Sequence, residues 1–120
     1  MSMAFYYFKN DEWDRLIPSC RPLNNSNEMR MMSYYLSELD IEFSENILND
    51  LRNDNINILD ISSETWQVVI DGKNVTICSI YDEDNNDFKA TVNKDVFEKL
   101  IVARLDFLRQ DYSLEIIIDL

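Results

Sequence analysis

The chain has 120 residues, 46% apolar and 28% charged, which is the size and composition of one domain with a packed core. Its 23 acidic residues against 11 basic ones give a formal net charge of −12, which opposes binding to nucleic acid or anionic lipid, since both need a positive surface. The lack of histidine excludes Ser-His-Asp and Cys-His catalysis, and the single glycine excludes a glycine-rich phosphate loop. We therefore expect one domain over residues 1–120 that binds a protein partner, with no catalytic activity, no cofactor and no metal, and without binding nucleic acid or membrane.

The N-terminal part of the chain predicts one strand followed by a loop. Residues 4–8 are rich in aromatic side chains, and either the odd-numbered or the even-numbered ones form the inward face of the predicted strand. Residues 18–27 predict a loop, because prolines and several Asn and Ser residues interrupt any periodic pattern. Cys20 lies between the prolines and is expected to be a loop thiol.

The cysteine usage and the apolar runs indicate the compartment. Two cysteines in a chain of this length do not form the disulfide framework of a small secreted protein, and Cys78, within the apolar run 75–80, is expected to be a small buried hydrophobe. Residues 1–9 lack the basic and long apolar segments of a secretion signal, and no apolar stretch approaches the roughly 20 residues that span a bilayer. We therefore expect a cytoplasmic protein.

Residues 28–43 are ambiguous between helix and strand. Four apolar residues recur at helical spacing: Met29, Met32, Leu36 and Leu39. The alternation typical of a strand is also present, at Met32, Tyr34 and Leu36. We favour a helix over residues 27–39.

A short helix and a short strand are predicted in the middle of the chain. Ser44 is a residue type that caps helices, and the apolar residues after it recur at helical spacing, so we predict a helix over residues 45–52. The polar residues 53–55 end this helix, and residues 56–61 predict a short strand.

The single glycine, Gly72, marks a β-hairpin. Asp71 and Gly72 separate two apolar segments, and a two-residue Asp-Gly loop closes a hairpin because glycine adopts positive φ freely. Pairing outward from this loop puts four apolar side chains on one face, Val68 opposite Val75 and Trp66 opposite Ile77. Residues 88–92 alternate in the same way, so we predict an antiparallel three-stranded meander over residues 66–92.

The C-terminal part predicts a helix and a strand. Asn93 is a favourable N-cap for a helix over residues 94–110, with Arg104 and Arg109 in its later turns, where cations are favourable. Residues 112–119 end in a run of isoleucines and predict a largely buried closing strand. The whole pattern indicates an α+β domain, in which helices pack on one face of an antiparallel sheet.

The connection between the last two meander strands is strongly acidic. Asp82, Asp84 and Asn86 match the first three ligand positions of a calcium-binding EF-hand loop, but Asp87 stands where glycine is needed and Asn93 where the bidentate glutamate belongs. We therefore do not expect calcium there. One interpretation is a solvated turn, and the other is a docking surface for a basic partner, formed by Asp82, Glu83, Asp84 and Asp87.

A second candidate docking surface lies near the N-terminus. Asp11, Glu12 and Asp14 surround Trp13, so that an aromatic anchor is ringed by carboxylates. The alternative is that Trp13 covers the inward face of the neighbouring strand. A surplus of carboxylates speeds the encounter with a basic protein, although solubility is a simpler reason for the same charge.

Residues 66–110 resemble the C-terminal half of small immunity proteins, the cytoplasmic antitoxins of bacterial contact-dependent inhibition and other polymorphic toxin systems. The resemblance rests on the hairpin at Gly72, the acidic turn, the capped segment 91–100, in which Phe97 precedes Leu100, and the segment 105–108. It implies a protein that binds and neutralises one cognate toxin domain, often a basic nuclease, without catalysis. No binding residues transfer, because such interfaces differ from pair to pair.

Two other functions fit the size and the charge. A type III secretion chaperone would form a stable dimer and hold an extended effector segment in an apolar groove. A phage-encoded inhibitor that mimics nucleic acid would carry regularly spaced acids over one face, whereas the acids of this chain are spread along the sequence.

Overall fold

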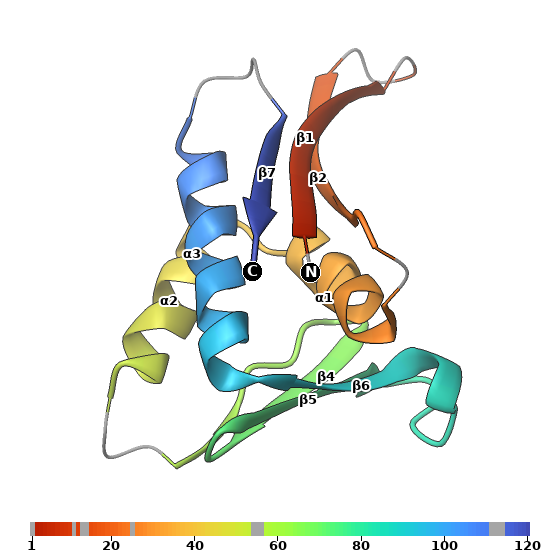
Figure 1. Ribbon diagram of the computed structural model, residues 1–120, viewed down its shortest axis with the longest axis vertical. Helices are drawn as coiled ribbons and strands as arrows, with labels where there is room; N and C mark the ends of the chain where they lie inside the picture. Colours follow the sequence, from red (N-terminus) through yellow and green to blue (C-terminus); the bar gives the residue numbers. More distant parts are fainter. Residues whose placement is uncertain (1, 11, 13–14, 25, 54–56, 111–114) are drawn as a thin grey trace.

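The computed structural model describes residues 2–10, 12, 15–24, 26–53, 57–110 and 115–120 (Figure 1). Within these residues the elements are, in chain order, β1 (Ser2–Asn10), β2 (Arg15–Pro22), α1 (Asn27–Ser37), α2 (Ile41–Leu51), β3 (Ile58–Asp60), β4 (Trp66–Asp71), β5 (Asn74–Ser79), the 3₁₀ turn η1 (Asn86–Phe88), β6 (Lys89–Asn93), α3 (Lys94–Leu108) and β7 (Ile116–Asp119).

The strands form two antiparallel sheets with helices between them. One sheet has the order β2-β1-β7 and the other the order β3-β4-β5-β6. Helix α1 lies between the sheets and contacts both, α3 packs against β5 and β6, and α2 packs against α3 (Figure 1). The α+β class and the meander with helices on one face are therefore confirmed. The separate sheet on the other side of α1 is not part of the prediction.

The first half of the segment predicted as a loop, residues 18–22, belongs to strand β2, so the prediction is wrong there and holds for residues 23, 24 and 26. β2 pairs with β1, and Pro18 lies opposite Tyr7. Proline is tolerated because β2 is an edge strand, where a missing N–H group on the open side breaks no inter-strand hydrogen bond. Cys20 is consequently not a loop thiol. It is buried in β2, and its Sγ donates a hydrogen bond to the carbonyl oxygen of Ser33 at 3.2 Å.

The odd-numbered aromatic side chains of β1 face the core. Phe5 is buried, with its ring centre 5.8 Å from that of Phe107, and Tyr7 stacks on the Phe107 ring at 4.6 Å. Phe107 belongs to α3 and is itself buried, so α3 covers this part of the first sheet. Of the two faces that the sequence leaves open, the odd-numbered one is the inward face.

Helix α1 confirms the helical interpretation, although it ends at Ser37. Its buried face is rich in methionine and consists of Met29, Met31, Met32, Ser33, Tyr35 and Leu36. Arg104 of α3 holds its C-terminal end, since the guanidinium donates to the carbonyl oxygens of Leu39 at 3.0 Å and Ser37 at 3.5 Å. Arg104 is 2% exposed, so it does not act as the surface cation expected in the later turns of α3. It satisfies carbonyl groups at the end of α1 instead.

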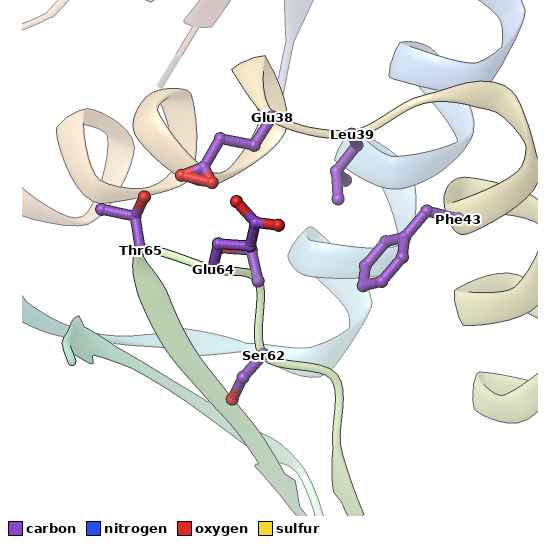
Figure 2. Close-up of a pocket in the computed structure, with 7 residues that line it drawn as sticks. Glu38, Leu39, Phe43, Ser62, Glu64 and Thr65 are labelled. Carbon is purple, nitrogen blue, oxygen red and sulfur yellow. The ribbon is translucent and has the colours of Figure 1, made fainter.

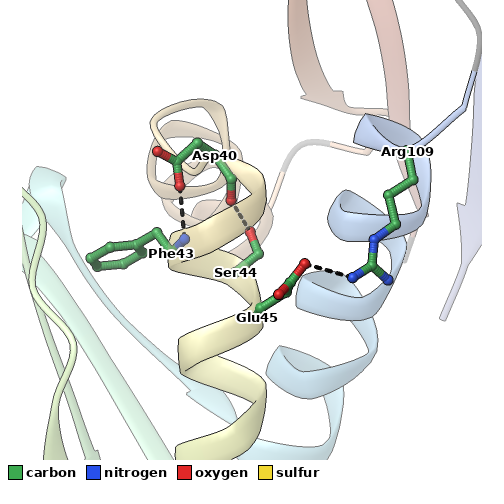
Figure 3. A network of polar contacts seen from close by, with 5 residues as sticks. All are labelled: Asp40, Phe43, Ser44, Glu45 and Arg109. Atoms are coloured by element: carbon green, nitrogen blue, oxygen red, sulfur yellow. Dashed lines mark hydrogen bonds and ion pairs between the residues drawn. The ribbon is translucent and has the colours of Figure 1, made fainter.

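Helix α2 begins earlier than predicted, because Asp40 and not Ser44 is its N-cap. A carboxylate oxygen of Asp40 accepts a hydrogen bond from the N–H of Phe43 at 2.7 Å, and the Ser44 hydroxyl donates to the Asp40 carbonyl oxygen at 2.7 Å (Figure 3). Ser44 is therefore buried in the first turn. On the exposed side, Arg109 pairs with Glu45 at 2.7 Å and ties the end of α3 to α2.

The meander is confirmed, but the register of its first hairpin is shifted by two residues. The loop residues are Gly72, with φ +59°, and Lys73, so that Asp71 pairs with Asn74. The predicted pairs are therefore wrong, because Val68 lies opposite Ile77, Ile70 opposite Val75 and Trp66 opposite Ser79. A shift of two residues leaves each side chain on its predicted face, so the buried face is correct.

The C-terminal elements agree with the prediction except in burial. Asn93 caps α3, its side-chain oxygen accepting a hydrogen bond from the N–H of Asp95 at 2.8 Å. β7 is not largely buried as expected, since it is an edge strand and Ile117 is 58% exposed. Cys78 is buried as predicted, and both cysteines are free thiols. Parts of two predicted strands, residue 56 and residues 112–114, lie outside the described residues.

Candidate functional site

The acidic connection between β5 and η1 is exposed. The predicted docking residues on it all lie at the surface: Asp82, Glu83, Asp84 and Asp87. The side-chain amide of Asn85 donates to a carboxylate oxygen of Asp82 at 3.1 Å, and its oxygen accepts from the N–H of Asp87 at 3.0 Å. Among the described residues, no three or more Asp, Glu or Cys side chains are grouped so that they could hold a metal ion. We call residues 82–87 the acidic loop.

The end of the acidic loop is fastened to the N-terminal turns of α1. Arg30 donates to the carbonyl oxygen of Asp87 and, at 2.6 Å, to the side-chain oxygen of Asn27. Asn27 in turn donates to the carbonyl oxygen of Lys89 at 2.8 Å, and the Arg30 guanidinium lies 5.8 Å from the centre of the Phe88 ring. These contacts fix the acidic loop in place before any partner binds.

Three aromatic side chains from three elements contact one another beside this attachment. Tyr34 of α1 stacks on Trp66 of β4, with ring centres 5.5 Å apart and an angle of 13°, and Trp66 contacts Phe88 of η1 at 6.3 Å. We call these three residues the aromatic cluster. Tyr34 and Phe88 are 38% and 37% exposed, and Ile80 and Tyr81, which lead into the acidic loop, are exposed as well. Exposed apolar and aromatic groups beside charges are typical of protein docking surfaces.

A depression of about 740 Å³ opens beside the aromatic cluster. It is lined by Glu38, Leu39, Phe43, Ser62, Ser63, Glu64 and Thr65. Glu38 follows Tyr34 by one helical turn, and Thr65 directly precedes Trp66, so the depression adjoins the cluster. Glu38 and Glu64 are exposed, and Figure 2 shows their carboxylates pointing toward each other across the opening. We call it the Glu38–Glu64 pocket.

A buried tyrosine links helix α1 to the segment before β4, the two parts of the chain that lie on either side of this pocket. The hydroxyl of Tyr35 on α1 donates to the carbonyl oxygen of Ile61 at 2.6 Å. Burial raises the pKa of Tyr35, and the negative charges of Glu38 and Asp60 raise this pKa further. The hydroxyl therefore remains a donor at neutral pH, and the link between α1 and the segment before β4 is kept.

Of the second predicted docking surface, the structure describes only Glu12. Glu12 is exposed and lies between β1 and β2, whose adjoining ends are at the opposite end of the molecule from the acidic loop (Figure 1). Asp11, Trp13 and Asp14 lie outside the described residues.

The aromatic cluster is the part of the site that the sequence analysis missed. The alternation of the sequence predicts Trp66 and Phe88 on the inward faces of two strands, with Val68 and Ala90. In the structure Phe88 belongs to η1 and is exposed, and Trp66 is only half-buried. A signal was available in the polar residues at the strand ends, since Glu64 and Asp87 lie just before these aromatic side chains. An aromatic residue at the polar end of a strand lies at the edge of the helical layer that packs on the sheet, so its ring is only partly covered.

The comparisons with known proteins identify the family. Within the described residues, no helix is long and apolar enough to cross a membrane. Comparison with curated proteins and with solved structures finds no match to the chain. A family model matches residues 1–117, which is nearly the whole length. The chain therefore belongs to DUF5376, a family of unknown function.

Proposed function

We propose that this protein is an immunity protein, which binds and neutralises a basic toxin domain through the aromatic cluster and the acidic loop. The observation that carries the proposal is the aromatic cluster of Tyr34, Trp66 and Phe88, which is partly exposed to solvent and lies beside a loop with four carboxylate residues. Tyrosine and tryptophan in such positions supply most of the binding energy of many interfaces, because they bury a large area and lose little conformational entropy.

The charge of the chain supports a basic partner. A net charge of −12 accelerates encounter with a cationic protein and opposes association between two copies of this chain. Nucleases are basic at their clefts, because the cleft must attract phosphate, and carboxylates fixed at a surface can take the place of those phosphates. A nuclease domain is therefore the class of toxin that we propose.

The proposal includes a cytoplasmic location and the absence of catalysis. Cys20 and Cys78 are both free thiols, as is usual in a reducing compartment. The resemblance of residues 66–110 to immunity proteins supports the same reading, since those proteins act in the cytoplasm by binding alone.

Coexpression with a toxin tests the proposal. The toxin domain encoded immediately upstream of this gene is expressed in cells with and without the protein, and we expect rescue of growth and copurification of a complex. Tyr34→Ala should weaken the complex about thirtyfold and reduce rescue, whereas Tyr6→Ala, on the first sheet, should change neither. The proposal is overturned if the upstream product is not toxic, or if Tyr34→Ala and the original protein bind it equally.

The chaperone alternative is tested separately. A type III secretion chaperone must form a stable dimer, so light scattering on the purified protein at micromolar concentration separates the two functions. We expect a monomer, since like charges oppose self-association.

A further inference from the structure

We infer that the Glu38–Glu64 pocket accepts an arginine side chain of the protein partner. The inference rests on the proposed function for the identity of that partner, and it names the group that the partner presents. Its evidence is independent of the acidic loop, because the pocket lies on the other side of the aromatic cluster and is built from α1, the start of α2 and the segment before β4.

The two carboxylates at the opening are available for a cation. Glu38 and Glu64 are both exposed, and no hydrogen bond or ion pair engages either carboxylate among the described residues. They come from different elements and point toward each other (Figure 2). A planar guanidinium has five N–H donors directed to several sides, so it can serve two facing carboxylates at once, whereas a compact ammonium group is suited to one strong contact.

One wall of the pocket is apolar, as the stem of an arginine requires, and the facing wall consists of Ser62, Ser63 and Thr65. Leu39 is 3% exposed and Phe43 is half-buried at the pocket wall. An arginine places its methylene groups along apolar surface while its charged end stays near polar groups. The volume of about 740 Å³ is that of an open depression, which a side chain from another protein can enter without displacing any part of this chain.

The segment that carries Glu64 is held in one conformation. The Ser63 hydroxyl oxygen accepts from the N–H of Trp66 at 3.1 Å, and the Ser63 N–H donates to the carbonyl oxygen of Trp66 at 2.9 Å. The N–H of Ile80 donates to the carbonyl oxygen of Thr65 at 3.1 Å, which joins the same segment to the end of β5. The backbone that carries Glu64 therefore loses little conformational entropy when a ligand binds here, and the remaining cost is the ordering of the glutamate side chains.

The opposite wall is equally fixed. Arg104 donates to the carbonyl oxygen of Leu39 from the buried side through two of its nitrogens, at 3.0 and 3.3 Å. Asp40 then caps α2 and sets the position of Phe43. The pocket is thus complete without a ligand, and its position beside Tyr34 and Trp66 allows a bound arginine to be covered by the same interface.

A peptide titration tests the inference without any toxin. The isotope-labelled protein is titrated with acetyl-Gly-Arg-Gly-amide and, separately, with the same peptide carrying citrulline, which has the shape of arginine without its charge. Amide shifts in two-dimensional NMR should concentrate at Glu38, Leu39, Glu64 and Thr65 with the arginine peptide and be much smaller with citrulline. Glu38→Gln and Glu64→Gln should each weaken binding about threefold, and together about tenfold.

A matched charge change provides the control. Asp71→Asn with Asp106→Asn removes two exposed carboxylates that belong neither to the pocket nor to the acidic loop. This pair should leave the peptide affinity within about twofold, since screening weakens distant charges. The inference is overturned if citrulline binds equally, if the shifts centre elsewhere, or if the control pair weakens binding as much as the pocket pair. Self-association lost in the pocket pair would assign the pocket to a second copy and would also overturn it.

The same variants separate this inference from the proposed function. If the pocket pair leaves toxin binding unchanged while Tyr34→Ala weakens it, the arginine assignment fails and the immunity function stands. If the arginine peptide binds at the pocket but no toxin is neutralised, the immunity function fails and the arginine site stands.

Discussion

The two sheets each support a stacked aromatic pair, but the pairs end differently. On the first sheet, Tyr7 stacks on Phe107 at 4.6 Å, and Phe107 is 2% exposed because α3 carries it into the interior. On the meander, Trp66 stacks on Tyr34 at 5.5 Å, and Tyr34 remains 38% exposed on α1. The same kind of contact therefore stabilises the fold in one place and forms a surface in the other. What distinguishes them is whether a further layer covers the rings.

The largest expected difference between the two pairs is in stability. Phe107→Ala leaves a cavity under β1 and should lower the free energy of unfolding by about 3–5 kcal/mol. Tyr34→Ala removes a ring that is already partly solvated and should cost less than about 1 kcal/mol. Urea unfolding followed by tryptophan fluorescence measures both. Equal losses of stability would contradict the distinction between an aromatic pair that stabilises the core and one that forms a surface.

The reverse order is expected for partner binding. Tyr34→Ala should weaken the complex with the toxin domain by about 2 kcal/mol, which is roughly thirtyfold in Kd. Tyr6→Ala serves as the control, since Tyr6 is a partly exposed aromatic residue of the first sheet that lies 5.7 Å from the Arg21 guanidinium. Its Kd, measured by calorimetry, should stay within about twofold. A comparable loss in both variants would place the interface outside the aromatic cluster.

A smaller effect on association is expected from the charges of the acidic loop, beside Tyr34 and Trp66. Glu83→Gln with Asp84→Asn should slow association about threefold at low ionic strength, and the difference should shrink at high salt because screening removes long-range attraction. Stopped-flow mixing at two salt concentrations measures the rate constant. The matched pair Asp71→Asn with Asp106→Asn, away from the cluster, should change the rate less.

The smallest effect is on stability and concerns Asp60, in the segment that precedes Trp66. Hydrogen bonds from the side chain and backbone of Ser62 lower the pKa of Asp60. This stabilisation is present above the unfolded-state pKa of about 3.9 and is lost as pH falls through the lower folded-state pKa. Asp60→Asn should therefore be slightly less stable than the original protein at pH 7 and equal to it in strong acid. Urea unfolding across this pH range measures the difference, and a gap that persists in acid would contradict the assignment.

Elements with one clear period and a recognisable boundary residue were predictable from sequence. Helix α3 begins at its Asn93 cap, and the meander turns at Gly72, as the local chemistry requires. The hairpin register was not predictable, because loops at residues 71–72 and 72–73 place the same residues on the buried face. Strand β2 was hidden by Pro18, since whether proline fits a strand depends on that strand being at an edge.

The role of Arg104 and the position of the candidate site depend on contacts between distant segments. Arg104 occurs where a surface cation would be expected, and its burial follows from the Leu39 carbonyl group lying opposite it. The sequence of the acidic loop indicates either a solvated turn or a docking element, and the structure places the loop at the surface beside the aromatic cluster. The cluster itself joins α1, β4 and η1, so no local pattern could assemble it.

Arg104 holds the backbone of the Glu38–Glu64 pocket, separately from the two glutamates that form its rim. The buried guanidinium donates to the carbonyl oxygen of Leu39 and so positions the backbone there. Glu38 and Glu64 are exposed, and within the described residues their carboxylates make no hydrogen bond or ion pair. Rim residues can therefore be exchanged without changing the shape of the opening. Under the immunity function proposed above, this division allows the specificity for a toxin to change by substitution at the surface while the same scaffold is inherited.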